Sequence, residues 1–258
     1  MSARIVSFAR GAGWLGEGWR LFRASPFGWF TLVFGYWFMM SLLSIVPYAG
    51  VIVAPLLVPA FSVGFMAAAR GAAAARPIEF TALFAGFRER VRAQLALGAF
   101  YALMLAAVVG LSTLADDGAL ARWFLLGIPP EEGVLHSNGF FAALLVAMAA
   151  YVPVMMAFWF APLLVAWHGY APLKALFYSF FACFMNWRAF VAYGVAAALI
   201  AGVLPWTVLL LMSLLSGGKG ISPLIAMLML LMMLLPTFLA SFYASYRDIF
   251  AGDLPTES

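Results

Sequence analysis

The acidic residues and histidines are the side chains best suited to acid–base or metal chemistry, and their spacing argues against both. The chain has ten Asp and Glu and two His, and no carboxylate lies inside an apolar run. His136 and His168 follow different apolar runs and are predicted to lie on opposite sides of a membrane, and Cys183 is the only cysteine. Because no nucleophile–base pair or ligand cluster can assemble, the sequence predicts no enzyme, no cofactor and no metal site.

One glycine motif resembles a nucleotide-binding fingerprint. Residues 11–16, GAGWLG, match G-x-G-x-x-G. That fingerprint requires a preceding strand and a following helix within a βαβ unit. Here an amphipathic, arginine-bearing segment surrounds it, so a dinucleotide site is rejected. The net charge of +4 is small, and most basic residues flank apolar runs, so no nucleic-acid partner is predicted.

Three closely spaced arginines, Arg88, Arg90 and Arg92, stand directly before an apolar run. Basic residues at this position attract anionic lipid headgroups at about 1 kcal/mol each. They are candidate headgroup contacts. Ordinary topology-setting charge explains the cluster equally well.

The composition defines the elements that carry these residues. The chain is 66% hydrophobic and 9% charged, whereas soluble domains carry about 25% charged residues. Six runs are long enough to cross a bilayer as helices. These runs are about 27–46, 49–69, 95–115, 139–166, 189–214 and 222–245. We predict an all-α fold, a polytopic membrane bundle of six transmembrane helices forming a single integral membrane domain over 1–258.

The basic residues predict the orientation. Twelve of the fourteen Lys and Arg lie on the side that holds both termini, and only Arg122 and Lys219 lie on the other. The positive-inside rule therefore places both termini in the cytoplasm. The first run begins near residue 27, after several charges, so a cleavable signal peptide is not expected.

Repeated strings suggest internal symmetry. The string APLLV occurs at 54–58 and again at 161–165, and Pro55, Pro162 and Pro236 each lie within an even-numbered run. Proline removes a helical hydrogen bond, so the three are candidate structural hinges. We predict three parallel two-helix repeats, at about 4–70, 78–168 and 172–250. The alternative is chance matching in a chain rich in Leu, Phe and Ala.

Each repeat is predicted to begin with an interfacial amphipathic helix. Apolar residues recur at helical spacing before each odd-numbered run. The three stripes are Ile5, Phe8, Ala12, Leu15, Trp19 and Phe22; Phe80, Phe84, Phe87 and Val91; and Leu173, Phe177, Phe180, Phe184 and Trp187.

Two terminal segments carry a resemblance. GWRLFRASPFGWF (18–30) and SFYASYRDIF (241–250), together with six runs, resemble a family of uncharacterised bacterial six-span inner-membrane proteins. A weaker likeness is to membrane domains of the glycerophosphodiester phosphodiesterase type. The resemblance implies location in the bacterial inner membrane and supplies no catalytic residues. Arg247 and Asp248 are expected to pair with each other or with cytoplasmic loops, which ties the last span down.

Two functions remain open. Proline-bearing spans, symmetry and interfacial aromatic helices favour a carrier or channel for an apolar, amphipathic or lipid-like solute. The scarcity of polar groups in the runs favours a non-transporting scaffold or accessory subunit of a larger membrane complex. The expected partners are the lipid bilayer, anionic lipid and another membrane subunit.

Overall fold

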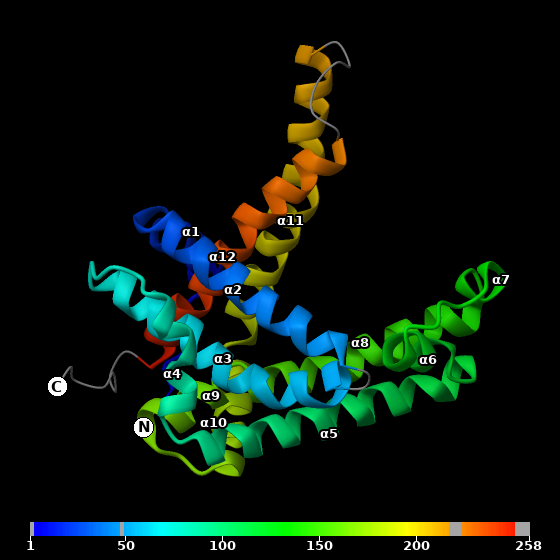
Figure 1. Ribbon diagram of the computed structural model, residues 1–258, viewed down its shortest axis with the longest axis horizontal. Coiled ribbons are helices and arrows are strands. Elements are labelled where there is room, and N and C mark those ends of the chain that lie inside the picture. The colour runs from blue at the N-terminus through cyan, green and yellow to red at the C-terminus, as the bar shows by residue number, and fades with distance from the viewer. Residues whose placement is uncertain (1–2, 47–48, 217–222, 251–258) are drawn as a thin grey trace. The chain divides into compact units, whose positions relative to one another are not determined.

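The computed structural model describes residues 3–46, 49–216 and 223–250, and every regular element in these ranges is a helix (Figure 1). The elements are α1 (Phe8–Ala24), α2 (Pro26–Ile45), α3 (Ala49–Ala73), the 3-10 helix η1 (Phe80–Phe84), α4 (Ala85–Arg88), α5 (Val91–Asp116), α6 (Ala119–Leu126), α7 (Glu132–Leu135), α8 (Asn138–Phe158), α9 (Ala161–His168), α10 (Pro172–Met185), α11 (Trp187–Ser216) and α12 (Pro223–Ile249). The all-α prediction is confirmed for these residues.

Five helical segments of the described chain are long and apolar enough to cross a membrane. They are Pro26–Ile45, Gly50–Ala73, Val91–Asp116, Asn138–His168 and Trp187–Leu214. These segments match the first five predicted runs. The sixth predicted run, 222–245, begins outside the described residues and continues in α12, where several side chains are also outside them.

The chain forms two compact units. Unit 1 comprises Met1–Tyr36, Gly64–Leu83 and Phe184–Ser258, and unit 2 comprises Trp37–Val63 and Phe84–Cys183. The unit boundaries fall inside α2, α3, η1 and α10, so each of these elements contributes residues to both units.

In unit 1, α1 packs against α11 and α12 through a face lined by glycine. A Cβ atom at Gly11 would collide with the backbone carbonyl of Ala189, and one at Gly18 would collide with that of Thr237. Between these glycines, Trp14 is fully buried and meets the ring of Phe190 edge-on at 5.3 Å between centroids. The missing side chains let the helix backbones approach closely, and the indole fills the remaining space.

The segment before α1 is also fixed within unit 1. The amide N–H of Val6 donates to Oδ1 of Asn186 at 2.8 Å, and Nδ2 of Asn186 donates to the carbonyl oxygen of Arg4 at 3.0 Å. The N–H of Arg4 in turn donates to the carbonyl oxygen of Ile249 at 2.9 Å. The start of the chain is therefore bonded just before α11 and at the end of α12.

In unit 2, α5 runs along α8 (Figure 1). The hydroxyls of Tyr101 and Tyr151 lie 3.1 Å apart across this pair. Gly98 of α5 lies against the backbone of Leu56 in α3, too close for a Cβ atom. Glycine again sets the approach of two helices.

The three predicted interfacial segments are helical, but their packed faces differ from the predicted stripes. The first is α1, the second divides into η1 and α4, and the third is α10. The first stripe is divided: Leu15 and Phe22 are buried, whereas Ile5 is 71% exposed and Phe8 60%. In the third stripe Phe177 is 60% exposed, and the buried side of α10 includes the small residues Ala175, Ser179 and Ala182. Small residues take part in the packed faces because they permit close backbone contact, and several bulky apolar side chains remain available to lipid.

Candidate functional site

The first turn of α5 meets both ends of α9 within unit 2, and we call this the α5–α9 junction. Its residues are Arg88, Arg90, Arg92, Gln94, Pro162, Gly169 and Ser179. It contains the three predicted headgroup arginines and one of the three predicted hinge prolines. It lies where the long apolar helix α5 begins, which is also where the basic residues are concentrated.

The fourth predicted span is broken at the junction. Helix α8 ends at Phe158 and α9 begins at Ala161, with Pro162 in its first turn. The hydroxyl of Ser179 accepts from the N–H of Phe160 at 2.9 Å and donates to the carbonyl oxygen of Met156 at 2.8 Å. A continuous helix would join that N–H and that carbonyl directly, since they are four residues apart. Ser179, which is fully buried on α10, is inserted into this bond and relays it.

Gln94 supports the same break from α5. Its Nε2 donates to the carbonyl oxygen of Pro162 at 2.9 Å, and the residue is fully buried. Because a carbonyl only accepts, the amide nitrogen must face it. Oε1 of Gln94 is therefore directed elsewhere, and it has no hydrogen-bond partner among the described residues. A buried unsatisfied polar atom at a helix break is typical of a site that needs a further donor.

The three arginines divide into two roles. Arg90 has left-handed backbone geometry (φ 52°) at the start of α5, and its Nη1 donates to the carbonyl oxygen of Gly169 at 3.1 Å. Gly169 has φ 68° and caps the end of α9. Gln94 and Arg90 therefore attach α5 to both ends of α9. Arg88 and Arg92 instead line an open hollow of about 360 Å³, together with Arg90, Val91 and Ala93.

The other predicted prolines lie in different surroundings. Pro55 lies inside α3, which also contains Pro59, and Pro236 lies inside α12. Both helices continue through these prolines. Of the three, Pro162 is the one that lies at an interruption, and the hinge role of all three stays a prediction.

Arg247 and Asp248 lie at the end of α12 and contact α1 in unit 1. Arg247 pairs with Glu17 and lies 3.4 Å from Oδ1 of its neighbour Asp248. Asp248 also pairs with Arg10, whose Nη2 lies 3.1 Å from Oδ1, and accepts from the indole N–H of Trp14 at 2.9 Å. Burial alone would raise the pKa of Asp248, but the hydrogen bonds from Arg10 and Trp14 outweigh it and hold this pKa below its ordinary value. The partners are therefore on α1 and not in a loop.

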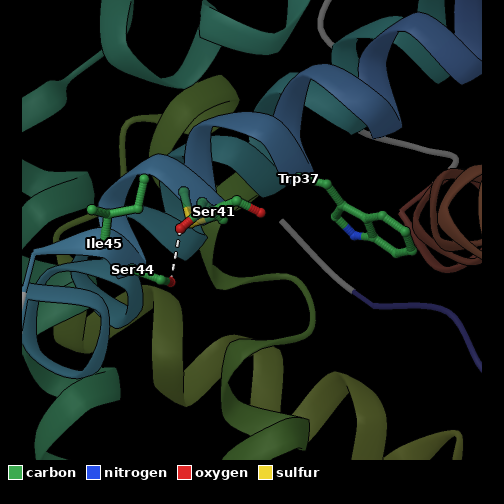
Figure 2. A pocket seen from close by; sticks show the side chains of 5 residues that line it. Trp37, Ser41, Ser44 and Ile45 are labelled. Carbon is green, nitrogen blue, oxygen red and sulfur yellow. Dashed lines mark hydrogen bonds between the residues drawn. The ribbon is translucent and has the colours of Figure 1, made fainter.

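A second hollow lies along α2 in unit 2. Figure 2 shows Trp37, Ser41, Ser44 and Ile45 lining it, and Met40 is a further lining residue. Oγ of Ser44 donates to the carbonyl oxygen of Met40 at 2.9 Å. The described lining residues of this hollow come from one helix, and they include hydroxyls but no charged group. It offers less chemistry than the junction.

The sequence analysis did not identify Gln94 or Ser179. Gln94 is the only glutamine of the chain and stands among apolar residues, which is a usable signal. Ser179 gives no such signal, because its partners are about twenty residues away and are brought to it by the packing of α10 on the broken span.

The described helices and the five membrane-capable segments define a multi-pass integral membrane protein. The chain is 38% identical over 196 residues to a protein of Burkholderia thailandensis named "Probable inner membrane protein", covering 73% of this chain and 72% of that protein. The chain belongs to this family of bacterial inner-membrane proteins, which confirms the resemblance to such a family. No protein-family model and no solved structure matches the chain.

Proposed function

We propose that the protein is a carrier or channel for an amphipathic, lipid-like solute in the bacterial inner membrane. The observation that carries the proposal is the break in the fourth predicted span. There the hydroxyl of Ser179 replaces the direct helical hydrogen bond between Phe160 and Met156, and Gln94 donates to the first turn of α9. Broken helices near polar side chains are typical of transporter substrate sites, where irregular backbone is kept only beside a cavity or another part of the protein. A scaffold helix has no need of this interruption.

The charge distribution favours an uncoupled solute path. No carboxylate lies in any predicted span, so a proton relay of the usual kind has no residues to use. We therefore propose passive movement of solute, without catalysis. The twelve basic residues on one side support the proposed orientation with both termini in the cytoplasm.

We also propose that the fold consists of three repeats. The contacts of the three interfacial segments support this, because each segment packs on a proline-bearing helix that bears an even predicted span. Leu83 of η1 lies against Gly64 of α3, Ser179 of α10 bonds the break before α9, and Gly18 of α1 lies against Thr237 of α12. The second and third interfacial segments each pack on the even-numbered span that precedes them in the chain. The first interfacial segment packs on α12, which carries the sixth predicted span. The same kind of contact therefore recurs in all three segments, and this recurrence supports the proposed repeat.

The test is lipid movement in vesicles. Purified protein is reconstituted into phosphatidylcholine vesicles that contain a trace of headgroup-labelled fluorescent phospholipid, and dithionite bleaches the label in the outer leaflet. A carrier or channel for lipid-like solutes extends bleaching beyond the outer-leaflet fraction seen in protein-free vesicles. Bleaching that stops at that fraction, with the protein inserted and folded, rules the proposal out.

One observation favours the accessory-subunit alternative. Helix α11 has exposed apolar side chains at intervals of three and four along its length, and these are Val191, Val195, Leu199, Val203, Trp206 and Leu210. This stripe suits either lipid or a helix of another membrane subunit. Purification in mild detergent separates the two, because a subunit partner co-purifies at a fixed ratio and is lost on Leu199→Ser with Val203→Ser.

A further inference from the structure

We propose that the hollow at the start of α5 binds the phosphate of an anionic phospholipid headgroup, with Arg88 and Arg92 as its cationic contacts. This inference concerns binding alone and does not depend on solute transport. It commits to a membrane lipid and not to free phosphate.

The first argument is charge. Three guanidinium groups line one hollow, and none of the described residues in its lining is a carboxylate. Glu89 stands between two of the arginines in sequence but does not line the hollow. Like charges held this close repel one another, and a bound anion relieves the repulsion. A phosphate diester matches the planar donor fork of arginine better than a chloride ion does.

The second argument assigns separate roles to the arginines. Arg90 already donates to the carbonyl of Gly169 and fixes the end of α9. The side chains of Arg88 and Arg92 are exposed at the hollow. The ligand is therefore contacted mainly by Arg88 and Arg92, while Arg90 maintains the shape of the junction.

The third argument favours a lipid over a free anion. Val91 and Ala93 supply an apolar part of the lining, and Val91 is the first residue of a 26-residue helix that is long enough to cross the bilayer. A hollow at this position lies at the depth of lipid phosphates, with hydrocarbon beyond it. An amphipathic ligand satisfies both the guanidinium groups and the apolar residues, whereas inorganic phosphate satisfies only the first.

The test uses the full-length protein in mild detergent and native mass spectrometry. The protein is titrated with dioctanoyl phosphatidylglycerol, with dioctanoyl phosphatidylcholine and with inorganic phosphate. We expect saturable binding of phosphatidylglycerol, weaker binding of phosphatidylcholine, and no competition from inorganic phosphate. At about 1 kcal/mol for each arginine, Arg88→Gln with Arg92→Gln weakens phosphatidylglycerol binding roughly thirtyfold.

The matched control is Arg23→Gln with Arg188→Gln. These two arginines lie on the same predicted side of the membrane, and they stand over the rings of Trp19 and Trp187 respectively. Neither is among the described residues that line the hollow. The control removes the same charge and leaves binding within about threefold of the parent, since neither arginine lines the hollow. Equal losses in both double variants, or displacement of the lipid by inorganic phosphate, overturn the inference. Arg88→Lys with Arg92→Lys, expected to restore part of the binding, shows whether a loss reflects charge or misfolding.

Discussion

The indole N–H of Trp14 donates to Oδ2 of Asp248 across the contact between α1 and α12, at 2.9 Å. Asp248 also accepts from Arg10, and Arg247 beside it donates to Glu17. The first helix of the chain and the last described helix are thus joined by a small network of alternating charges around a buried ring. Its four charged members can be substituted without changing the apolar core. They are Arg10, Glu17, Arg247 and Asp248.

The Asp248 network predicts a dependence of stability on acid pH. The pKa of Asp248 is lower in the folded protein than its ordinary value, so its contribution is present above about pH 4 and is lost as pH falls through the folded value. Glu17 is the other acidic group in the network. We expect the thermal midpoint, followed by tryptophan fluorescence, to fall on acidification.

Asp248→Asn provides the control for this pH dependence. The amide keeps the shape of the side chain but does not titrate, so the variant is less stable at neutral pH. Its midpoint is expected to change less than that of the parent as pH falls from about 6 to about 3, a range that includes the ordinary carboxyl pKa. A parallel curve for the variant and the parent contradicts the role given to Asp248.

The glycine face of α1 predicts opposite effects of one substitution at two positions. Gly11→Ala forces a methyl group into the carbonyl of Ala189 and is expected to cost about 1–3 kcal/mol. Gly16→Ala meets no atom within 4 Å and is expected to stabilise the helix by about 0.5–1 kcal/mol. Thermal unfolding in detergent, measured by tryptophan fluorescence, distinguishes the two. Similar shifts for both variants would show that α1 does not pack through its glycines.

Ser179→Ala is expected to destabilise the broken span by about 1–2 kcal/mol, because it leaves the N–H of Phe160 and the carbonyl of Met156 without the relay. Cys183, the only cysteine, is buried one turn further along α10 and reports unfolding when a thiol-reactive dye gains access. Ser44→Ala is the control, since Ser44 is exposed and bonds only within its own helix. Equal midpoints for the Ser179 and Ser44 variants would argue against the relay.

Gln94→Glu is expected to make the protein more stable at acid pH than at neutral pH, which is the reverse of the usual effect of acid on folding stability. A carboxylate at this buried position cannot donate to the carbonyl of Pro162, whereas the protonated acid can. The variant therefore makes the contact only when the acid is protonated, so it is expected to be most stable at low pH and to lose stability as pH rises. The measurement is dye access to Cys183 across the pH range, with Gln94→Leu as the variant that cannot titrate. A Glu variant that follows the Leu variant at every pH refutes the contact.

The proposed orientation predicts which loops face outward. In a Cys183→Ala background, Glu131→Cys in the segment between α6 and α7 is expected to react with a membrane-impermeant maleimide on intact cells. Ala74→Cys, just after α3, is expected to react only after the membrane is broken. Labelling of Ala74→Cys in intact cells reverses the orientation.

The sequence predicted the long helices well because lipid imposes a simple rule. A run of apolar residues of the right length must be helical in a membrane, and the first five predicted runs each coincide with a membrane-capable segment. Proline alone did not predict the break, because α3 and α12 continue through Pro55 and Pro236, whereas the span that holds Pro162 is interrupted just before it.

The packed faces could not be predicted in the same way. Counting apolar residues at helical spacing selects Leu15 and Phe22, which are buried, but it also selects Ile5, which is exposed, and it misses Gly11 and Gly18, where the backbone of α1 makes close contacts. In lipid, bulky apolar side chains need no shielding from water, so apolar spacing alone does not predict which face of a helix packs. The relay at Ser179 was unpredictable for a further reason, because it depends on where α10 docks and not on any local pattern.

The bonds that hold Arg4 and Val6 beside Asn186 and Ile249 have a consequence for synthesis. The ribosome completes these partners only after most of the polypeptide has been translated. Trp14 and the glycines around it therefore cannot pack on α11 and α12 until every intervening segment has been inserted. A nascent chain that ends before α12 leaves α1 without one of its two packing partners. Such a product is expected to be a substrate for the quality-control proteases of the membrane.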